Sequence, residues 1–559
     1  MSAWPAPVRE GCDRDRLSES HTVAFLGESM GSRRYWYGLL GLSAAVLLYL
    51  WATPWPLGVP GEWEWDRIGG PVVQWIPGWF LTELVAAAYL AVVWSGLRWG
   101  MDGLKRGVSL WLGVLSLAGF AWLWSVQEFA APPVCLGKAA WVLYFPGSSG
   151  YFTIARAETD DVAEFLRSYE DRMEQGDVLH VGTHPPGLFL LYRVAIDLCE
   201  RFPSLRAWVH RLEPESYRES CQIIRETARS GHTVLPSSDR AVLWLVALFT
   251  QAVAVGTVFP LFGVMRRSVS RPAAWMAAGF WPLVPALGVF LPKSDALYPL
   301  LAMTFLWAWG EGLRRRSAAM GFVAGLLAWL GLFLSLALLP ALALAAWMTV
   351  WELWDAWKHN HQFWRKGAWL LGAAVMGFAL PTLLLWLAAD INLLRVWWLN
   401  YRNHAAFYSQ YTRTYWKWLV VNSAELLWGV GAPLVILAGI GLKRAVAAYR
   451  QGVAREPAST AAAIVIVWGL LWVSGKNMGE AARLWIVVMP WVVWLAAPAF
   501  LPPSDGWGKD REGLVRPSSS PFLVRMWLYT LVIQMVVCVG TVSRIDGFGL
   551  VRLTELPGP

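Results

Sequence analysis

The 559-residue chain is 56% hydrophobic and only 15% charged, and its formal net charge is +8. A soluble enzyme of this length would carry far more charge on its surface, so the composition excludes an ordinary soluble globular protein. The positive charge does not indicate nucleic-acid binding, because the basic residues gather in short stretches between apolar runs, as in the cytoplasmic loops of membrane proteins. We expect an all-α, polytopic transmembrane helical bundle embedded in membrane lipid.

The order of polar and apolar segments predicts the organisation of the chain. Residues 1–34 are polar and rich in arginine, and we interpret them as a cytoplasmic tail. Residues 35–127 should hold the first three transmembrane helices, because a run of ~20 apolar residues spans the hydrocarbon layer. A polar region covers 128–240, a second helix bundle covers 241–543, and a C-terminal tail covers 544–559. The expected spans are 35–53, 76–97, 108–127, 241–264, 272–290, 295–313, 319–335, 337–354, 367–388, 418–441, 460–475, 482–501 and 522–543.

The charges of the connecting loops predict which side each loop faces. The loops rich in Arg or Lys are 98–106, 266–271, 314–316, 358–366, 443–455 and 502–521. Because such loops concentrate in the cytoplasm, we expect a protein of the cell (plasma) membrane with a cytoplasmic N-terminus and with 128–240 on the non-cytoplasmic face. The short apolar segment 188–198 carries Arg193 and Asp197 at helical i,i+4 spacing. A span there would turn every later basic loop outward, so we expect a juxtamembrane half-helix within this large non-cytoplasmic loop.

The non-cytoplasmic region holds the most informative polar residues. Asp160 and Asp161 precede a predicted helix, and Thr183–Gly187 has the sequence Thr-His-Pro-Pro-Gly. The two prolines fix the backbone after His184 and cannot continue a helix. His184 should therefore be held at a defined place where the chain returns to the membrane. An ordinary proline-rich loop terminator is the alternative interpretation.

Thr183–Gly187, at the start of an apolar segment after a polar outer loop, resembles the His-Pro-Pro motif of the GT-C glycosyltransferases. This superfamily includes protein O-mannosyltransferases and bacterial arabinosyl and mannosyl transferases, which take sugars from polyprenyl-phosphate donors. Further short motifs that resemble family features lie at 292–295 (Pro-Lys-Ser-Asp), 400–404 (Asn-Tyr-Arg-Asn-His) and 479–485 (Gly-Glu-Ala-Ala-Arg-Leu-Trp). The resemblance covers roughly residues 108–500, as scattered motifs only. It implies an inverting hexosyl- or pentosyltransferase that acts on a lipid, glycan or protein acceptor at the non-cytoplasmic face.

One position departs from the family pattern. Members usually carry an acidic residue or an Asp-Glu pair in the first outer loop, followed by a tyrosine and an alanine. Here Tyr151 and Ala155 match the tyrosine and alanine, but the preceding residues 148–150 are Ser-Ser-Gly. The carboxylates that remain as alternatives are Asp160, Asp161, Glu128 and the cluster Glu62, Glu64 and Asp66. If none of them serves, the protein is inactive as an enzyme.

The implied reaction assigns roles to the polar residues. Sugar transfer needs a base for the acceptor hydroxyl and positive charge on the departing phosphate. We expect Asp160 or Asp161 to be the base and His184 to orient the donor or acceptor. The residues expected to bind substrate or its phosphate are Tyr151, Lys293, Asp295, Arg402, His404, Lys476, Glu480 and Arg483.

Each of these assignments has a structural alternative. Asp160 and Asp161 suit the start of a helix, where acidic residues are favoured. Glu480 and Arg483 suit an i,i+3 ion pair. No cofactor is assigned, and a divalent cation (Mg²⁺ or Mn²⁺) would have only Asp160 and Asp161 as carboxylate ligands.

Two other functions compete with the enzyme. A transporter or flippase would show broken helices and an internal repeat; the sequence has no such repeat, although Pro282, Pro285 and Pro340 can break helices. A non-catalytic membrane scaffold is favoured by the missing acidic pair. The polar loop with its His-Pro-Pro motif favours the enzyme.

Overall fold

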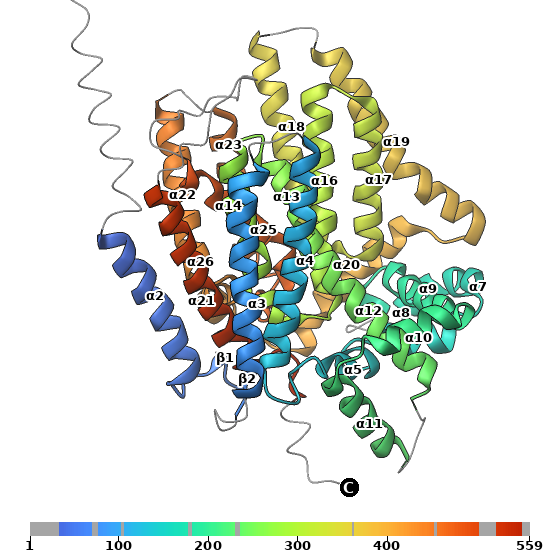
Figure 1. The fold of residues 1–559 in the computed structure, drawn as a ribbon. Helices are drawn as coiled ribbons and strands as arrows, with labels where there is room; N and C mark the ends of the chain where they lie inside the picture. Colours follow the sequence, from blue (N-terminus) through green and yellow to red (C-terminus); the bar gives the residue numbers. More distant parts are fainter. Residues whose placement is uncertain are drawn as a thin grey trace, which may run out of the picture.

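The computed structural model describes residues 33–69, 76–101, 105–176, 181–229, 235–359, 363–451, 455–501 and 521–550. Eight helices in these parts of the chain are long and apolar enough to cross a membrane. Three shorter apolar helical stretches, Ala318–Leu334, Pro457–Val473 and Ile486–Phe500, coincide with further expected spans. The prediction of an all-α, polytopic helical protein is confirmed, and the chain is a multi-pass membrane protein (Figure 1).

The elements fall into three groups along the chain. The first comprises α2 (Arg33–Trp51), β1 (Leu57–Val59), β2 (Trp63–Arg67), α3 (Ile76–Ser95), η2 (Gly96–Gly100) and α4 (Lys105–Phe129). The second comprises α5 (Lys138–Tyr144), α6 (Tyr151–Glu158), α7 (Val162–Arg167), α8 (Tyr169–Glu174), η3 (Val181–Thr183), α9 (Gly187–Arg201), α10 (Pro203–Arg211) and α11 (Glu215–Arg229). The third comprises α12 (Ser237–Gly256), α13 (Val258–Met265), α14 (Arg271–Ala278), η4 (Trp281–Leu283), α15 (Pro285–Phe290), η5 (Ser294–Leu297), α16 (Tyr298–Arg315), α17 (Ala318–Leu334), η6 (Leu336–Leu338), α18 (Leu339–His359), α19 (Phe363–Ala389), α20 (Leu393–Gln410), α21 (Tyr415–Val430), α22 (Ala432–Arg450), α23 (Arg455–Val473), α24 (Ala481–Leu484), η7 (Ile486–Val488), α25 (Pro490–Ala496), η8 (Ala497–Phe500), α26 (Pro521–Val542) and β3 (Ile545–Asp546).

Small residues let the helices of the bundle approach closely. A Cβ atom added at Gly325 of α17 would lie 2.0 Å from the backbone oxygen of Ala374 in α19. A Cβ atom at Gly377 of α19 would lie 2.2 Å from the backbone oxygen of Phe322. Only glycine permits these contacts, which is the usual device where lipid supplies no hydrophobic drive between helices.

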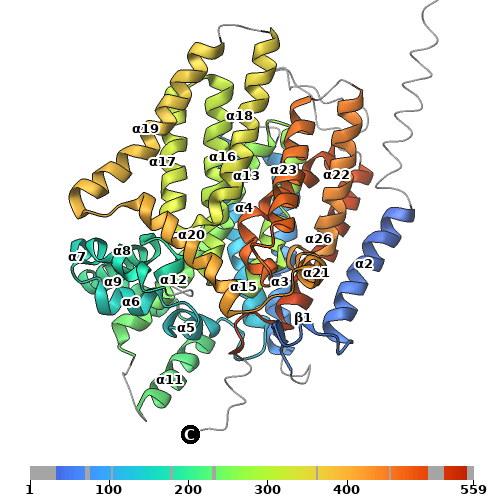
Figure 2. The same cartoon turned by 180° about the vertical axis from the view of Figure 1, so that it is seen from behind.

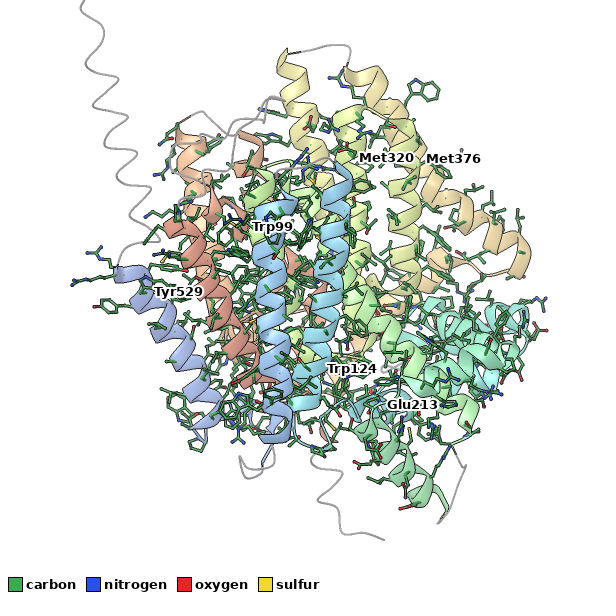
Figure 3. The ribbon with its side chains drawn as sticks, viewed as in Figure 1. Trp99, Trp124, Glu213, Met320, Met376 and Tyr529 are labelled. Carbon is green, nitrogen blue, oxygen red and sulfur yellow. The ribbon has the colours of Figure 1, made fainter. Side chains whose placement is uncertain are left out.

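The outer surface of the bundle is apolar. Trp99, Met376 and Tyr529 project away from the helices that carry them (Figure 3), and their exposed fractions are 61%, 58% and 58%. Water would disfavour so many large exposed apolar groups. The bundle therefore presents a surface suited to lipid.

The single span expected at 418–441 is wrong. The chain forms two helices there, α21 and α22, separated at Gly431, whose φ is 95°. This left-handed backbone suits glycine alone, and Pro433 starts the next helix. The basic stretch expected as the loop 443–455 is correspondingly helical up to Arg450.

The connections between helices separate into two ends. The adjoining ends of α3 and α4, of α16 and α17, and of α18 and α19 lie at one end, where the basic loops were expected, and α5, α8, α10 and α11 lie at the other (Figures 1 and 2). The segment 188–198 falls within α9, a 15-residue helix of the second group. Arg193 and Asp197 form the expected i,i+4 contact at 2.6 Å.

A small antiparallel sheet was not expected from the sequence. β2 pairs with β1 and with β3, so part of the expected C-terminal tail folds against the loop between α2 and α3. The expected cytoplasmic tail lies outside the described residues up to residue 32, as do 502–520 and 551–559.

Candidate functional site

The Gly-Glu-x-x-Arg segment forms a sharp turn before α24. Gly479 has a φ of 90° and Glu480 a φ of 56°, a left-handed conformation that is uncommon for glutamate. The turn brings the Glu480 carboxylate onto the Arg483 guanidinium, with Oε1–Nη1 and Oε2–Nη2 distances of 2.9 Å. The ion pair that the spacing allowed is therefore a bidentate contact between side chains only 19% and 18% exposed. Within the described part of the chain, Nε of Arg483 is buried and makes no hydrogen bond.

Three more of the predicted site residues lie around Arg483, although they come from distant segments. Asp295 of η5 and Tyr151 of α6 interact electrostatically with its guanidinium. Lys293, in the turn between α15 and η5, interacts with Arg483, Asp295 and Glu480. We call these five residues the Arg483 cluster. It combines two cations, two carboxylates and a phenol in one place.

Lys293 is held at the cluster by the chain before α6. Its ammonium donates a hydrogen bond to the backbone carbonyl of Ser148. Burial lowers the pKa of Lys293 to about 8; the charge of Arg483 acts in the same direction, and Asp295 and Glu480 oppose it. Lys293 is thus a cation whose charge responds to pH near neutrality.

Asp295 is the uncommitted carboxylate of the cluster. It is half-buried, and it makes no hydrogen bond or ion pair with any residue that the structure describes. Its charge nevertheless acts on Lys293, Tyr151 and Arg483. A carboxylate in this state can accept a proton from a ligand without first breaking a contact.

His184 lies against the cluster through Tyr151. The two rings meet edge to face, with centroids 5.4 Å apart. Tyr169 of α8 donates a hydrogen bond to the backbone oxygen of His184 at 2.6 Å, and Asn400 of α20 donates to that of Thr183 at 2.8 Å. The backbone before the two prolines is therefore held by side chains from two helices.

Gly187 is the first residue of α9. A Cβ atom at Gly187 would lie 2.4 Å from the backbone oxygen of Phe333, so glycine permits close contact between the start of α9 and the end of α17.

Asp160 and Asp161 lie in other surroundings. Asp160 is 85% exposed and pairs with Arg193 at 2.5 Å. Asp161 caps α7 by accepting a hydrogen bond from the Glu164 backbone N–H at 3.0 Å. The helix-start interpretation fits Asp161, whereas Asp160 is engaged by Arg193 of α9, and neither residue belongs to the Arg483 cluster.

A divalent cation does not fit at this pair. Asp160 and Asp161 are engaged by Arg193 and by the helix start. Among the described residues, no group of three or more His, Cys, Asp or Glu side chains is placed to hold a metal ion.

Two of the other carboxylates considered from the sequence, Glu128 and Glu62, also have structural partners. Glu128, at the end of α4, accepts a hydrogen bond from Ser216 at 2.8 Å. Glu62 accepts from the backbone N–H of Thr414 at 2.7 Å and from Nε1 of Trp418 at 2.8 Å. Burial raises the pKa of Glu62, but the hydrogen bonds from Thr414 and Trp418 outweigh this and hold it at about 2. Glu62 therefore ties the loop after β1 to the start of α21.

Two of the remaining predicted binding residues, His404 and Lys476, belong to a second group on α20 and the loop before α24. The ammonium of Lys476 lies 4.4 Å from the centre of the Tyr401 ring, a cation–π contact. Tyr408 accepts a hydrogen bond from the Met478 N–H at 3.1 Å. Burial lowers the pKa of His404, and the charge of Lys476 lowers it further.

Arg402 stands apart from both groups. Its side chain is exposed on α20, and it makes no hydrogen bond or ion pair with the residues that the structure describes. Its predicted role in phosphate binding has no geometric support.

Sequence reasoning missed residues that shape the cluster. Glu425 of α21 is buried, and its Oε2 accepts from the Ala482 N–H at 3.1 Å, next to Arg483. Tyr192 of α9 stacks beside Tyr151, with centroids 6.2 Å apart. Tyr192 lies in α9, eight residues after His184, and no sequence motif marked it.

Comparison of the chain with profiles of known protein families, with curated proteins and with solved structures found no match. Fold and site together define the class of this protein. It is an all-α, multi-pass membrane protein with a largely buried cluster of charged residues between its helices.

Proposed function

We propose that the chain is an inverting membrane glycosyltransferase of the GT-C type. It moves a sugar from a polyprenyl-phosphate donor to a lipid, glycan or protein acceptor. The observation that carries the proposal is the Arg483 cluster, in which motifs far apart in the sequence supply an uncommitted carboxylate beside two cations.

The cluster supplies the groups that sugar transfer requires. The acceptor hydroxyl gives its proton to Asp295 and attacks the anomeric carbon, while the bond from that carbon to the phosphate oxygen breaks. Charge then grows on the polyprenyl phosphate, where Arg483 and Lys293 stabilise it. Displacement in one step inverts the anomeric centre. Tyr151 and His184 line the sugar.

The location of the cluster supports the expected side of the membrane. Tyr151 of the cluster lies on α6, which is at the end opposite the basic loops (Figure 2). By the positive-inside rule, the proposed reaction takes place on the non-cytoplasmic face of the cell membrane, with the N-terminus in the cytoplasm.

A transfer assay tests the proposal. The purified protein is reconstituted in liposomes with a panel of polyprenyl-phosphate sugars and with lipid, glycan and peptide acceptors. We expect release of free polyprenyl phosphate together with a glycosylated product. Movement of the intact donor across the bilayer without cleavage would instead identify a flippase. If neither transfer nor movement of the donor is observed, the protein is a non-catalytic scaffold.

The pH dependence of donor use tests Lys293. Its pKa of about 8 means that the ammonium is charged below this pH and neutral above it. We therefore expect kcat/KM for the donor to fall about tenfold per pH unit above pH ~8, as a group required in its protonated form is lost from the free enzyme.

Two variants separate Lys293 from other titrating groups. Lys293→Arg retains its charge and should keep kcat/KM constant to higher pH. Lys293→Gln should have a low kcat/KM for the donor at every pH. If kcat/KM of Lys293→Arg falls above pH ~8 as it does in the wild-type protein, a group other than Lys293 causes the fall.

A further inference from the structure

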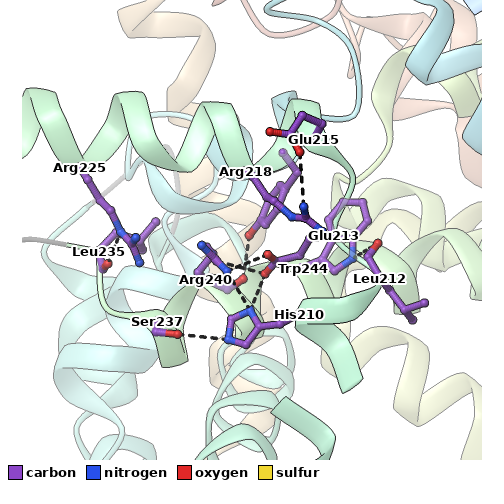
Figure 4. A network of polar contacts seen from close by, with 11 residues as sticks. His210, Leu212, Glu213, Glu215, Arg218, Arg225, Leu235, Ser237, Arg240 and Trp244 are labelled. Atoms are coloured by element: carbon purple, nitrogen blue, oxygen red, sulfur yellow. Dashed lines mark hydrogen bonds and ion pairs between the residues drawn. The ribbon is translucent and has the colours of Figure 1, made fainter. Parts of the chain in front are cut away.

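A second polar group lies at the start of α12, outside the Arg483 cluster (Figure 4). It joins three elements: His210 is in the last turn of α10, Glu213 is in the turn before α11, and Ser237 is the first residue of α12. Oγ of Ser237 lies 3.2 Å from Nε2 of His210. Nδ1 of the same ring lies 2.7 Å from Oε1 of Glu213.

The contacts of the two ring nitrogens determine how His210 can act on Ser237. An acid on Nδ1 fixes the tautomer that carries its proton there, which leaves the lone pair of Nε2 toward the hydroxyl. His210 is thereby placed to take the proton of Ser237. This serine–histidine–acid arrangement is defined by geometry and recurs on unrelated folds.

Arg240 holds the acid of this group in place. Its Nη2 lies 2.9 Å from Oε2 of Glu213, and its Nε donates to Oε1 at 3.2 Å. The Glu213 side chain is fully buried, and Arg240 supplies the paired positive charge that a buried carboxylate requires. Nη2 also lies 3.3 Å from Nδ1 of His210, but the Glu213 oxygen is the closer partner of that nitrogen.

Ser237 is exposed and stands at a helix N-terminus. The first N–H groups of α12 have no intrahelical acceptor, and the helix dipole favours negative charge beside them. An oxyanion formed on a carbonyl bound to Ser237 would meet these donors. The nearby carboxylate of Asp239 is neutralised by an ion pair with Arg156 at 2.9 Å.

The surroundings indicate the class of substrate. The apolar stretch Ser237–Met265 is one of the candidate membrane spans, so the serine lies where this span meets the membrane surface. Phe202, Trp208 and Leu212, at and beside α10, are 51%, 52% and 37% exposed. These apolar side chains suit contact with acyl chains.

We propose that Ser237, His210 and Glu213 form an esterase site for carboxylic esters of lipids at the membrane surface. Oγ of Ser237 attacks the acyl carbon as its proton passes to Nε2 of His210. The ester C–O bond breaks, and the alcohol leaves with that proton. Water, deprotonated by His210, then hydrolyses the acyl-serine and restores the hydroxyl. This activity does not depend on sugar transfer.

Covalent labelling tests the nucleophile. The full-length protein in detergent micelles is treated with a fluorophosphonate probe, and its hydrolysis of a p-nitrophenyl acyl ester is measured. We expect the probe on the peptide that contains Ser237 and no labelling or hydrolysis in Ser237→Ala. Ser238→Ala removes the neighbouring hydroxyl and should keep both signals.

Two further variants test the histidine and the acid. His210→Gln should lower the labelling rate by ~10²–10⁴-fold, as expected for loss of a general base. Glu213 is a positioning residue, so Glu213→Gln should lower kcat with KM unchanged when rates are compared per folded protein. A wild-type protein that neither hydrolyses the ester nor takes the probe would overturn the proposal, as would equal labelling of Ser237→Ala.

Discussion

Replacing Asp295 with asparagine is expected to reduce sugar transfer by ~10²–10⁴-fold, the usual effect of losing a general base. The amide has nearly the shape of the carboxylate but cannot accept the proton of the acceptor hydroxyl. Because Asp295 makes no hydrogen bond or ion pair within the described parts of the chain, the substitution should leave the fold intact. Initial rates with saturating donor and acceptor, together with thermal unfolding, measure the two effects separately.

The carboxylates proposed from the sequence serve as matched controls. Asp160→Asn removes an exposed ion pair with Arg193, and surface pairs contribute little to stability. Asp161→Asn keeps an acceptor for the helix cap. Both variants, and Glu128→Gln, should retain turnover. Full activity in Asp295→Asn with loss in Asp160→Asn or Asp161→Asn would place the base before α7.

Replacing Arg483 with alanine is expected to lower the rate by ~10²–10³-fold, the cost of losing one preorganised charge on the leaving group. The effect should be larger for donor use than for acceptor use, since the guanidinium acts on the departing phosphate. Arg483→Lys keeps the charge but loses the fork of donors, so it should recover only part of the rate. Steady-state kinetics with each substrate varied in turn measure this difference.

The contact between Arg483 and Glu480 requires its own control. If the bidentate pair only folds the turn before α24, then Glu480→Gln and Arg483→Ala should damage stability and activity alike. If Arg483 binds phosphate, Glu480→Gln should keep most donor use, because the guanidinium remains. Equal losses of activity and stability in both variants would reduce Arg483 to a structural residue.

The apolar runs by themselves determined the class of fold. A segment such as 367–388, which lies within α19, has no stable alternative to a helix in lipid, since every backbone polar group must be satisfied within it. The prediction for 188–198 used a different argument, because its short length and the charges of the later loops indicated a juxtamembrane half-helix; the segment lies within the 15-residue helix α9.

The break between α21 and α22 was harder to predict. The residues on both sides of the break are as apolar as those of a continuous helix. The hydropathy of the sequence therefore does not reveal the left-handed backbone at Gly431 between the two helices. The pairing of β3 with β2 was equally invisible, because it joins two ends of the chain.

The short motifs in the sequence also singled out Lys293, Asp295, Glu480 and Arg483. Motifs identify residue types, however, and they do not show which groups already have partners. Asp160 and Asp161 looked like the base because they are adjacent acids near His184 in the sequence. Arg193, 33 residues further along, engages Asp160, and this contact exists only because α9 folds back against α6 and α7.

Tertiary structure alone decided which polar residues meet. Lys293 and Arg483 lie in different motifs, and the packing of η5 against η7 and of α15 against α24 brings them into one electrostatic environment. Ser237 and His210 share no motif at all, yet they lie 3.2 Å apart. The physical reason is that hydrophobicity is a property of each local segment, whereas the charge state and reactivity of a side chain depend on neighbours that only the packed chain supplies.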